Sequence, residues 1–404
     1  MSSESKTASM SSESKTASMS SESKTVKPVK TYISSRVDDE TTLFFTLNNI
    51  DVSIANGLRR IILSEIPTLG FKTFPHDENK AEFIQNTSRL NNEIIKQRLS
   101  CIPIYNIDHT KSFDELEVII EKTNDTQETI YVTTKDFRIL DNKSNTFLDD
   151  DVVQSIFPAN AITGDNIILA RLRPRISPEI PGEKLHIKAT MSLRTASEDG
   201  VYNVTSCCAY TYTPDTLKQD TKWQEYSATL EDMDHENMEI KKRDWGCLQA
   251  KRIYIPNSFD FKIQTIGVFT NVNIVLTACE IMIAHIEKLK TDIGDPNTFD
   301  EMLSYNAKST IPNCFDIILK NEGYTLGKVI EYLLHDLFYE KRKLLTYVGF
   351  QKPHPHIDSS LIRMAFKEPV ITETKFQTIS GIITSVCNDG IAIFRAIQGE
   401  FTND

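Results

Sequence analysis

Residue clusters that could carry out catalysis are few in this sequence. The nearest candidate for a metal site is the carboxylate run Asp149, Asp150 and Asp151, because clustered carboxylates hold the cations used in nucleotidyl transfer. The run lacks the spacing of such a site and lies in an expected loop between apolar segments. A solvated acidic run is the more common arrangement there, so we expect no metal site at these residues.

The cysteines and histidines also have structural interpretations. Cys207 and Cys208 are adjacent within an apparent strand, which favours buried packing over a nucleophile or a mutual disulfide. His354 and His356 flank Pro355, as in a rigid connector between strands. The chain has no phosphate-binding glycine loop, no HExxH and no GxSxG motif. We therefore expect no catalytic residue, no cofactor and no bound metal.

Composition limits the classes of function. The chain has 404 residues, 40% of them hydrophobic, and a net charge of −11, which argues against direct sequence-independent DNA binding. Its seven cysteines include no CxxC pair, as expected in a reducing intracellular compartment. The most apolar stretch, 274–286, is too short and too interrupted to span a membrane, and the N-terminus has no apolar signal core. A soluble intracellular protein is predicted.

The N-terminal segment is a repeat. MSSESKTAS occurs at 1–9 and 10–18 and recurs in truncated form at 19–25, with almost no apolar side chains. Such a segment cannot offset the entropy of ordering, so residues 1–30 are expected to form a disordered tail. Tandem duplication of a start region is the simplest origin, and a specific docking or phosphorylated arm is the alternative.

A helix is predicted directly after the first strand, which covers 41–47. Asp51 is its expected N-cap and Pro67 ends it. One face is apolar through Ile54, Leu58, Ile61, Ile62 and Ile66. Gly57 lies inside the helix at a cost of about 1 kcal/mol relative to Ala, which close approach of another backbone would explain. Arg59 and Arg60 are either solvated or part of an interface.

The middle of the chain is predicted to be mainly β-structure. A second helix is expected at 88–99, followed by strand-like runs throughout 113–213. Residues 214–250 carry both signs of charge without apolar periodicity, and we expect an irregular surface excursion there. A strand at 260–265 and a strong helix at 271–290 complete this larger unit.

A smaller module follows a polar Gly/Pro hinge, TDIGDPN, at 291–297. Its predicted order is strand, helix, strand, strand and helix, at 313–319, 325–338, 344–349, 360–366 and 372–397. Because strands and helices do not alternate throughout, the fold class is α+β rather than a doubly wound sheet.

The helices at 271–290 and 372–397 are apolar over a wide arc, so each should be covered on two sides. Either the modules pack on each other through these helices, or each helix fills the core of its own module. For packing between modules, the candidate residues are Ile274, Ala278, Met282, Leu326, Ile330, Leu333, Ile379, Ile383 and Val386.

Several segments resemble one family in order along the chain. FTLNNIDVSIANGLRRIILSEIPTLGF at 45–71 resembles the signature of alpha-like RNA polymerase subunits, namely bacterial alpha, the archaeal D-type protein and the eukaryotic third-largest subunit. The segments at 86–104 and 256–289 are similar to later blocks of the D-type proteins. NEGYTLGKVIEYLLH at 321–335 and YVGFQKPHPHIDSSLIRMAF at 347–366 resemble their small partner, the archaeal L-type protein.

The resemblance implies a split dimerisation domain at 31–72 and 250–295, an insert domain with its excursion at 73–249, and a partner module at 296–404 packed on the first. It implies a non-catalytic platform on which the largest and second-largest polymerase subunits assemble with other small subunits, and nucleic acid contacts only through that complex. The helix with Arg59, Arg60 and Gly57 corresponds to the family's docking surface for the second-largest subunit. These three residues are therefore the candidates for the large-subunit interface.

The sequence departs from the family in two ways. Many D-type proteins bind zinc or an iron–sulfur cluster through clustered cysteines, but this chain has none between Cys101 and Cys207, so no metal is expected. Fusion of the two partners resembles the polymerases of large cytoplasmic DNA viruses, which implies host cytoplasm and virion, or otherwise the nucleus. The alternative functions are a free-standing adapter, which should be a clean monomer or dimer alone, and an enzyme, which would need a metal or cofactor.

Overall fold

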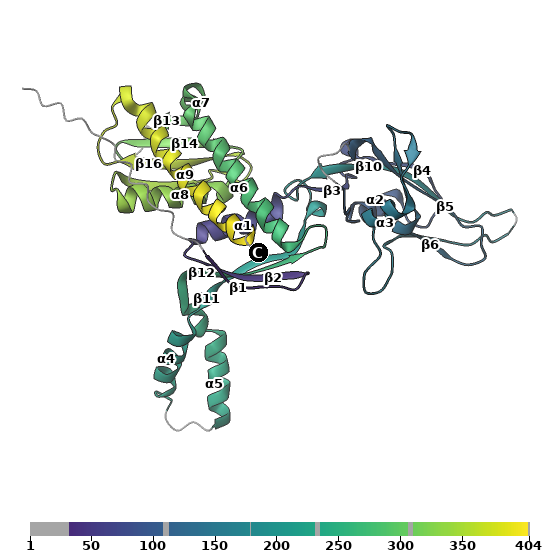
Figure 1. The fold of residues 1–404 in the computed structure, drawn as a ribbon, viewed down its shortest axis with the longest axis horizontal. Helices are drawn as coiled ribbons and strands as arrows, with labels where there is room; N and C mark the ends of the chain where they lie inside the picture. Colours follow the sequence, from purple (N-terminus) through teal and green to yellow (C-terminus); the bar gives the residue numbers. More distant parts are fainter. Residues whose placement is uncertain (1–31, 108–112, 178, 231–234, 306–309, 403–404) are drawn as a thin grey trace, which may run out of the picture.

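The computed structural model describes residues 32–107, 113–177, 179–230, 235–305 and 310–402. The expected disordered tail lies outside these residues. Figure 1 shows a platform of two sheets and several helices, from which an insert domain extends to one side and a pair of helices projects in another direction. Short 3₁₀ turns lie at His76–Glu78, Phe113–Glu115, Thr134–Asp136, Gly200–Tyr202, Ala250–Arg252 and Thr372–Thr374.

The first half of the platform is an antiparallel sheet covered by helices. Its strands, in the order β1-β2-β12-β11, are Tyr32–Asp38, Thr42–Asn48, Tyr254–Thr265 and Thr205–Pro214. In β2, Leu43, Phe45 and Leu47 are buried while Phe44 is 41% exposed, because successive side chains point to opposite faces. The expected insert, 73–249, included β11, but β11 pairs with β12 and belongs to the platform sheet.

Helix α1 (Val52–Ser64) begins and ends where the sequence predicts. The Asp51 carboxylate accepts a hydrogen bond of 2.8 Å from the Ser53 amide, which satisfies one of the free N–H groups of the first turn. Ile54, Leu58 and Ile61 face the interior. The helix ends before Pro67, and the long helix α6 (Asn271–Gly294) lies beside it.

The insert domain has a sheet and a core of its own. Its main sheet has the order β3-β10-β5-β7-β8, with β4 also on β10. These strands are Thr68–Phe71, Lys184–Arg194, Leu116–Thr123, Phe137–Asp141, Thr146–Phe147 and Ala81–Asn86. A two-stranded sheet of β6 (Ile130–Thr133) and β9 (Ile168–Leu172) and the helices α2 (Asn92–Ser100) and α3 (Asp150–Ile156) complete it.

The run Asp149–Asp151 lies at the start of α3 and not in a loop. Asp149 occupies the N-cap position, and Asp150 and Asp151 stand in the first turn, all three exposed to solvent. Negative charge is favourable at this end of a helix dipole. The acidic run therefore has a structural explanation.

The segment at 214–250 is not irregular, contrary to the prediction. It forms two helices, α4 (Thr216–Ser227) and α5 (His235–Cys247), which are the projecting pair in Figure 1. Neither helix buries a described side chain, so neither carries the apolar stripe on which a sequence-based helix prediction depends. The segment projects from the platform, but it is helical where an irregular structure was predicted.

The C-terminal module has the predicted order of elements with two additions. Its sheet, β13-β14-β16-β15, comprises Leu303–Tyr305, Cys314–Lys320, Ser359–Phe366 and Leu345–Gln351. Its helices are α7 (Pro296–Met302), α8 (Tyr324–Leu334) and α9 (Lys375–Thr402). A π-helical turn at His335–Lys341 extends α8. The two additions that the sequence did not predict are β13 and α7.

The polar hinge expected at 291–297 is not a loose linker. Helix α6 continues to Gly294, and α7 begins at Pro296 after the single residue Asp295. The Asp295 carboxylate accepts hydrogen bonds from the amide and hydroxyl of Thr298, at 3.0 and 2.7 Å. Proline is well suited to the first position of a helix, so the same residues that suggest a break also start a capped helix.

Candidate assembly interface

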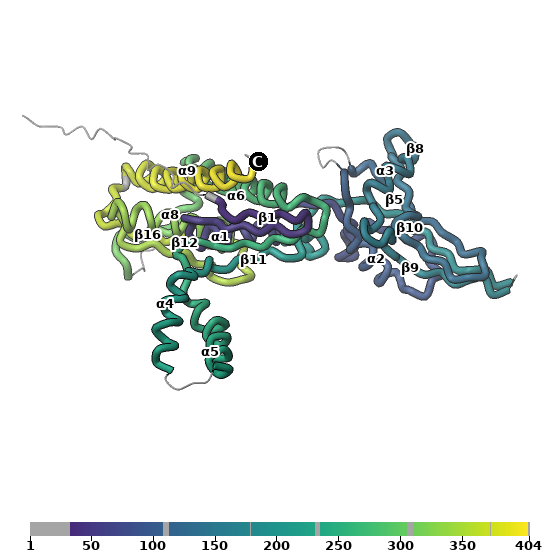
Figure 2. Tube along the Cα trace, turned by 60° about the horizontal axis from the view of Figure 1, so that its bottom comes forward, coloured from purple at the N-terminus to yellow at the C-terminus, as the bar shows by residue number. Residues whose placement is uncertain are grey.

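The two platform modules share one hydrophobic core. A single cluster of buried side chains extends from Leu43 in β2 to Phe401 in α9. Figure 2 shows the long helices α6 and α9 together on one side of the platform, with α8 and α1 beneath them. All nine residues proposed for packing between modules lie in this cluster, each at most 6% exposed. The wide apolar helices therefore cover each other.

Gly57 lies at a close approach of helices from both modules. A Cβ atom placed on Gly57 would stand 3.0 Å from Met282 Cε in α6 and 3.3 Å from Val329 Cγ2 in α8. The residue is buried, so it cannot contact a separate large subunit. Its predicted grouping with Arg59 and Arg60 as an external contact has to be corrected. The absence of a side chain at Gly57 allows α1 to approach α6 and α8.

The end of α9 anchors the second module in the first. The Phe401 ring meets the Phe45 ring edge-on, with the centroids 5.2 Å apart, and Arg36 Cζ lies 5.0 Å from the Phe401 centroid. Both rings are almost fully buried. The sequence did not predict this contact, because the predicted helix ended at 397, before Phe401.

Polar groups line one edge of the boundary between the modules. Arg60 Nε donates a 2.9 Å hydrogen bond to Thr325 Oγ1 of α8. His285 in α6 lies between two carboxylates, with Nε2 3.3 Å from Glu65 and Nδ1 3.2 Å from Glu322. The hydrogen bond to Glu322 raises the pKa of His285, against the effect of burial. Burial raises the pKa of the Glu65 carboxyl. This bridge joins α1, α6 and the second module.

A recess at the module boundary is made by both modules. It has a volume of about 420 Å³. The first module contributes Asp51, Val52, Ser53, Asn56 and Tyr210, and the second contributes Lys328, Glu331, Tyr332, His335 and Val348. The recess depends on the pairing of the modules, since neither module provides all of its walls.

Arg59 stands next to this recess. Its guanidinium donates hydrogen bonds of 3.1 and 2.9 Å to Asn56 Oδ1, one turn earlier in α1. Arg59 is half-buried and Arg60 is exposed. The two arginines therefore differ: Arg59 is held along the helix beside the recess, whereas Arg60 reaches across to the second module.

The described residues offer little reactive chemistry. Burial raises the pKa of the Cys208, Cys279 and Cys387 thiols to about 12, and a thiol that stays protonated is a poor nucleophile. His354 and His356 lie together between β15 and β16, where the His356 amide donates to His354 Nδ1 at 3.1 Å. Within the described ranges, no group of three or more His, Cys, Asp or Glu residues could hold a metal ion. None of the helices described is long and apolar enough to cross a membrane.

Comparison with known proteins identifies polymerase subunits. Residues 44–286 match the model of the RNA polymerase Rpb3/Rpb11 dimerisation domain. Subunit 3B of RNA polymerases IV and V from Arabidopsis thaliana is 28% identical over 194 residues, which is 43% of this chain and 54% of that protein. Subunit Rpo3 of Methanosphaera stadtmanae is 22% identical over 283 residues, covering 62% and 94% of the two chains.

A mouse relative, the RPAC1 subunit of RNA polymerases I and III, is 42% identical over 66 residues, covering 16% of this chain and 17% of that subunit. The alignments thus span about half of the Arabidopsis protein, nearly all of the archaeal one and a short part of the mouse one. The family match ends at residue 286, before the C-terminal module begins.

Proposed function

The chain belongs to the RNA polymerase Rpb3/Rpb11 dimerisation domain family as an Rpb3-like, non-catalytic subunit, and we propose that it carries both partners of the assembly platform in one polypeptide. The observation that carries this proposal is the single apolar core from Leu43 to Phe401. A module that merely followed the platform along the chain would have its own core, as the insert domain does. The C-terminal module instead fills the position of a dimerisation partner.

The way the helices pair supports this assignment. Each module contributes a shorter helix, α1 or α8, and a long helix, α6 or α9, on one face of a sheet. The shorter helices pack together and so do the long ones. Contacts between corresponding helices are characteristic of an isologous dimer, here formed by two related modules. Covalent linkage through α6 and α7 would make their pairing intramolecular and their ratio one to one.

In the assembled polymerase, the platform would hold the second-largest and largest subunits and would meet nucleic acid only through them. Arg59 and the recess beside it are the proposed docking surface for the second-largest subunit. Arginine suits such a position because its planar guanidinium forms several directed hydrogen bonds. Arg60 would have a double role, since it also bonds Thr325 across the module boundary.

Co-purification tests the proposal. The tagged chain should recover two large polymerase subunits from its native source, and Arg59→Ala together with Arg60→Ala should release them while the circular dichroism spectrum stays unchanged. Arg395→Ala is the control, because Arg395 is, like Arg60, an exposed arginine, 64% accessible, on a platform helix. If the wild type recovers no large subunit and is a clean monomer or dimer, a free-standing adapter is the better description.

We also attribute the fused platform to a polymerase of a large cytoplasmic DNA virus, active in the host cytoplasm and packaged in the virion. The support for this attribution is the fusion itself. The same purification, carried out on isolated virions, should then recover the chain with the large subunits. Its recovery only from nuclei of uninfected cells would contradict the attribution.

A further inference from the structure

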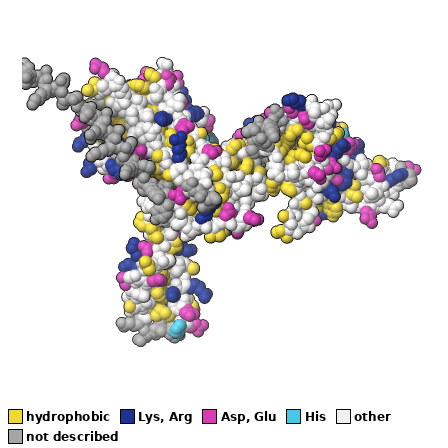
Figure 3. All heavy atoms as spheres, in the orientation of Figure 1, with side chains coloured by type: hydrophobic (Ala, Val, Ile, Leu, Met, Phe, Trp, Pro, Cys, Tyr) yellow, Lys and Arg dark blue, Asp and Glu magenta, His cyan; other side chains and the backbone are white. Residues whose placement is uncertain are grey.

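The paired helices α4 and α5 project from the platform and have no core to support them. Figure 3 shows them as a separate arm with apolar and charged side chains on its surface. Across the described residues of these two helices, no side chain is fully buried. Isolated helices of 12 and 13 residues are marginal in water, so this arm gains little from its own packing.

The base of the arm is nevertheless firmly attached. Gln219 Nε2 donates to the carbonyl oxygens of Ala250 and Ile253, both at 2.9 Å. Tyr212 and Tyr254, at the ends of β11 and β12, stack with their ring centroids 4.2 Å apart. These contacts fix the direction in which the arm leaves the sheet, as expected for an element that presents a binding surface.

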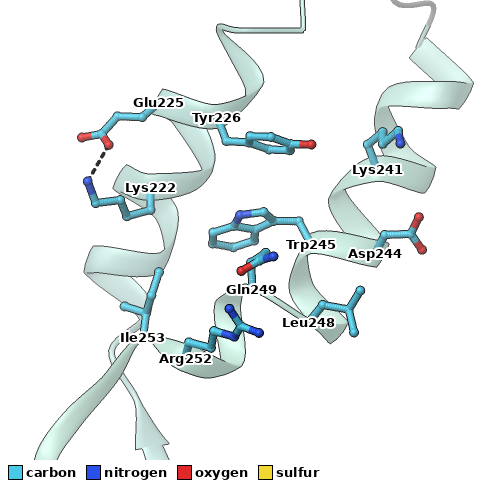
Figure 4. A pocket seen from close by; sticks show the side chains of 10 residues that line it. All are labelled: Lys222, Glu225, Tyr226, Lys241, Asp244, Trp245, Leu248, Gln249, Arg252 and Ile253. Carbon is cyan, nitrogen blue, oxygen red and sulfur yellow. Dashed lines mark hydrogen bonds and ion pairs between the residues drawn. The ribbon is translucent and has the colours of Figure 1, made fainter.

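That surface is an aromatic groove between the two helices, with a volume of about 770 Å³. Trp245 lies between the helices in Figure 4, with Tyr226 across from it and Leu248 at the side, 68% exposed. The rings of Trp223 and Trp245 contact each other, with their centroids 5.6 Å apart. The chain has two tryptophans in all, and both are here. Tryptophan and tyrosine in partly open pockets are typical anchors of protein interfaces.

The charges at the groove indicate the character of its occupant. Lys222 is already paired with Glu225 at 2.7 Å. Among the described residues, Lys241 and Arg252 have no ion-pair partner, and Asp244 is the one carboxylate at the groove left unpaired. In a chain of net charge −11, the groove thus offers an excess of unpaired positive charge around an apolar floor. Carboxylates are the complementary groups.

A protein segment fits these features better than a nucleic acid. Binding of single strands requires a continuous basic track with stacking aromatics, whereas here carboxylates such as Asp220, Glu225 and Asp244 interrupt the basic residues. Leu248 and Ile240 are exposed aliphatic side chains, which cannot stack on bases but can pack against apolar side chains. The arm combines an apolar floor with a mixed polar rim, as protein interfaces do.

We propose that the groove between α4 and α5 receives an acidic amphipathic segment of another subunit of the polymerase. One large apolar side chain of that segment packs between Trp245 and Leu248, and its carboxylates face Lys241 and Arg252. The inference rests on the proposed function in one respect, since the occupant is a component of the complex that the platform assembles.

Zero-length carbodiimide coupling of the native complex tests the proposal, because this reagent joins a lysine amine only to a carboxylate in direct contact. Mass spectrometry should identify an amide between Lys241 and an Asp or Glu of another subunit, near a large apolar residue. Leu248→Asp should lower the coupling yield at least tenfold, while Leu217→Asp, on the same arm but outside the groove, should not.

The possible results separate this proposal from the proposed function. Retention of both large subunits by Leu248→Asp, with loss of the coupling, would support both proposals. Coupling of Lys241 to this chain alone, or no coupling of Lys241 at all, would overturn the groove assignment whether or not the large subunits are recovered. Quenching of the free chain by a twenty-nucleotide oligo(dT), abolished by Lys241→Glu, would also overturn it in favour of nucleic acid.

Discussion

Replacement of Phe401 by alanine should loosen both platform modules, because this residue at the end of α9 is buried in the sheet of the first module. Its ring contacts Phe45 of β2 and lies under the Arg36 guanidinium. If the modules form one core, a cavity at this position weakens β2 as well as α9. If they are merely adjacent, only α9 should respond.

The expected loss can be estimated from the contacts. Phe401 is 3% exposed, and truncation of a buried phenylalanine to alanine costs about 3–5 kcal/mol through lost burial and the remaining cavity. Phe401→Leu keeps most of the apolar volume and should cost less than about 1.5 kcal/mol. The loss for alanine is a large part of the total stability of about 5–15 kcal/mol that is usual for a domain.

Urea unfolding followed by far-ultraviolet circular dichroism gives the overall loss, and hydrogen exchange shows where it falls. The amides of β2 and α9 should both exchange faster in Phe401→Ala. Phe147→Ala is the control, since Phe147 also lies beside an arginine, with Arg138 Cζ 3.8 Å from its ring centroid, but is 43% exposed in the insert domain. A loss below about 1 kcal/mol, or faster exchange confined to α9, would refute the single core.

Two further substitutions test the polar interactions. Arg363→Ala should cost about 3–5 kcal/mol in thermal unfolding, because it removes both 2.7 Å hydrogen bonds to the buried Asp316 carboxylate, and adding Asp316→Asn should recover much of that loss. His285 has a pKa raised above its ordinary 6.5 by Glu322 and Glu65, so its ion pairs stabilise fully below pH 6.5 and are lost as the pH rises through the folded value. The advantage of the wild type over His285→Gln in the unfolding midpoint should therefore shrink between pH 6 and pH 9, and an advantage that does not change with pH would contradict this assignment.

Local signals were sufficient for much of the platform. The cap Asp51, the apolar spacing of α1 and the stop at Pro67 act within a few residues of the chain, and the helix follows them. The same holds for the strands and helices of the C-terminal module from β14 onward. The acidic composition and the scarcity of catalytic motifs likewise indicate a protein that acts through its surfaces.

The sequence of a segment did not predict its structure where contacts with distant residues, or the lack of such contacts, determined it. Residues 216–227 and 235–247 form helices without a buried face, so their pattern carries no helical period. The polar residues of 291–297 suggest a break, but α6 continues to Gly294 because its apolar side packs along α9. Capping by Asp295 then starts α7 at once. In both cases the outcome depends on neighbours that the segment itself does not contain.

The sequence by itself determined four helices of the platform, α1, α6, α8 and α9, where α1 is capped, and that two of these helices are too apolar to stand alone. Only the tertiary structure decided that α6 and α9 cover each other, that Gly57 faces the second module rather than a separate subunit, and that Phe401 reaches Phe45. The physical reason is distance along the chain. Capping and periodicity act within a few turns, whereas pairing of the modules depends on which distant surfaces are complementary in shape. The tertiary structure also distinguishes Arg59 from Arg60, which are neighbours in sequence. Arg59 bonds Asn56 within α1, whereas Arg60 bonds Thr325 of α8.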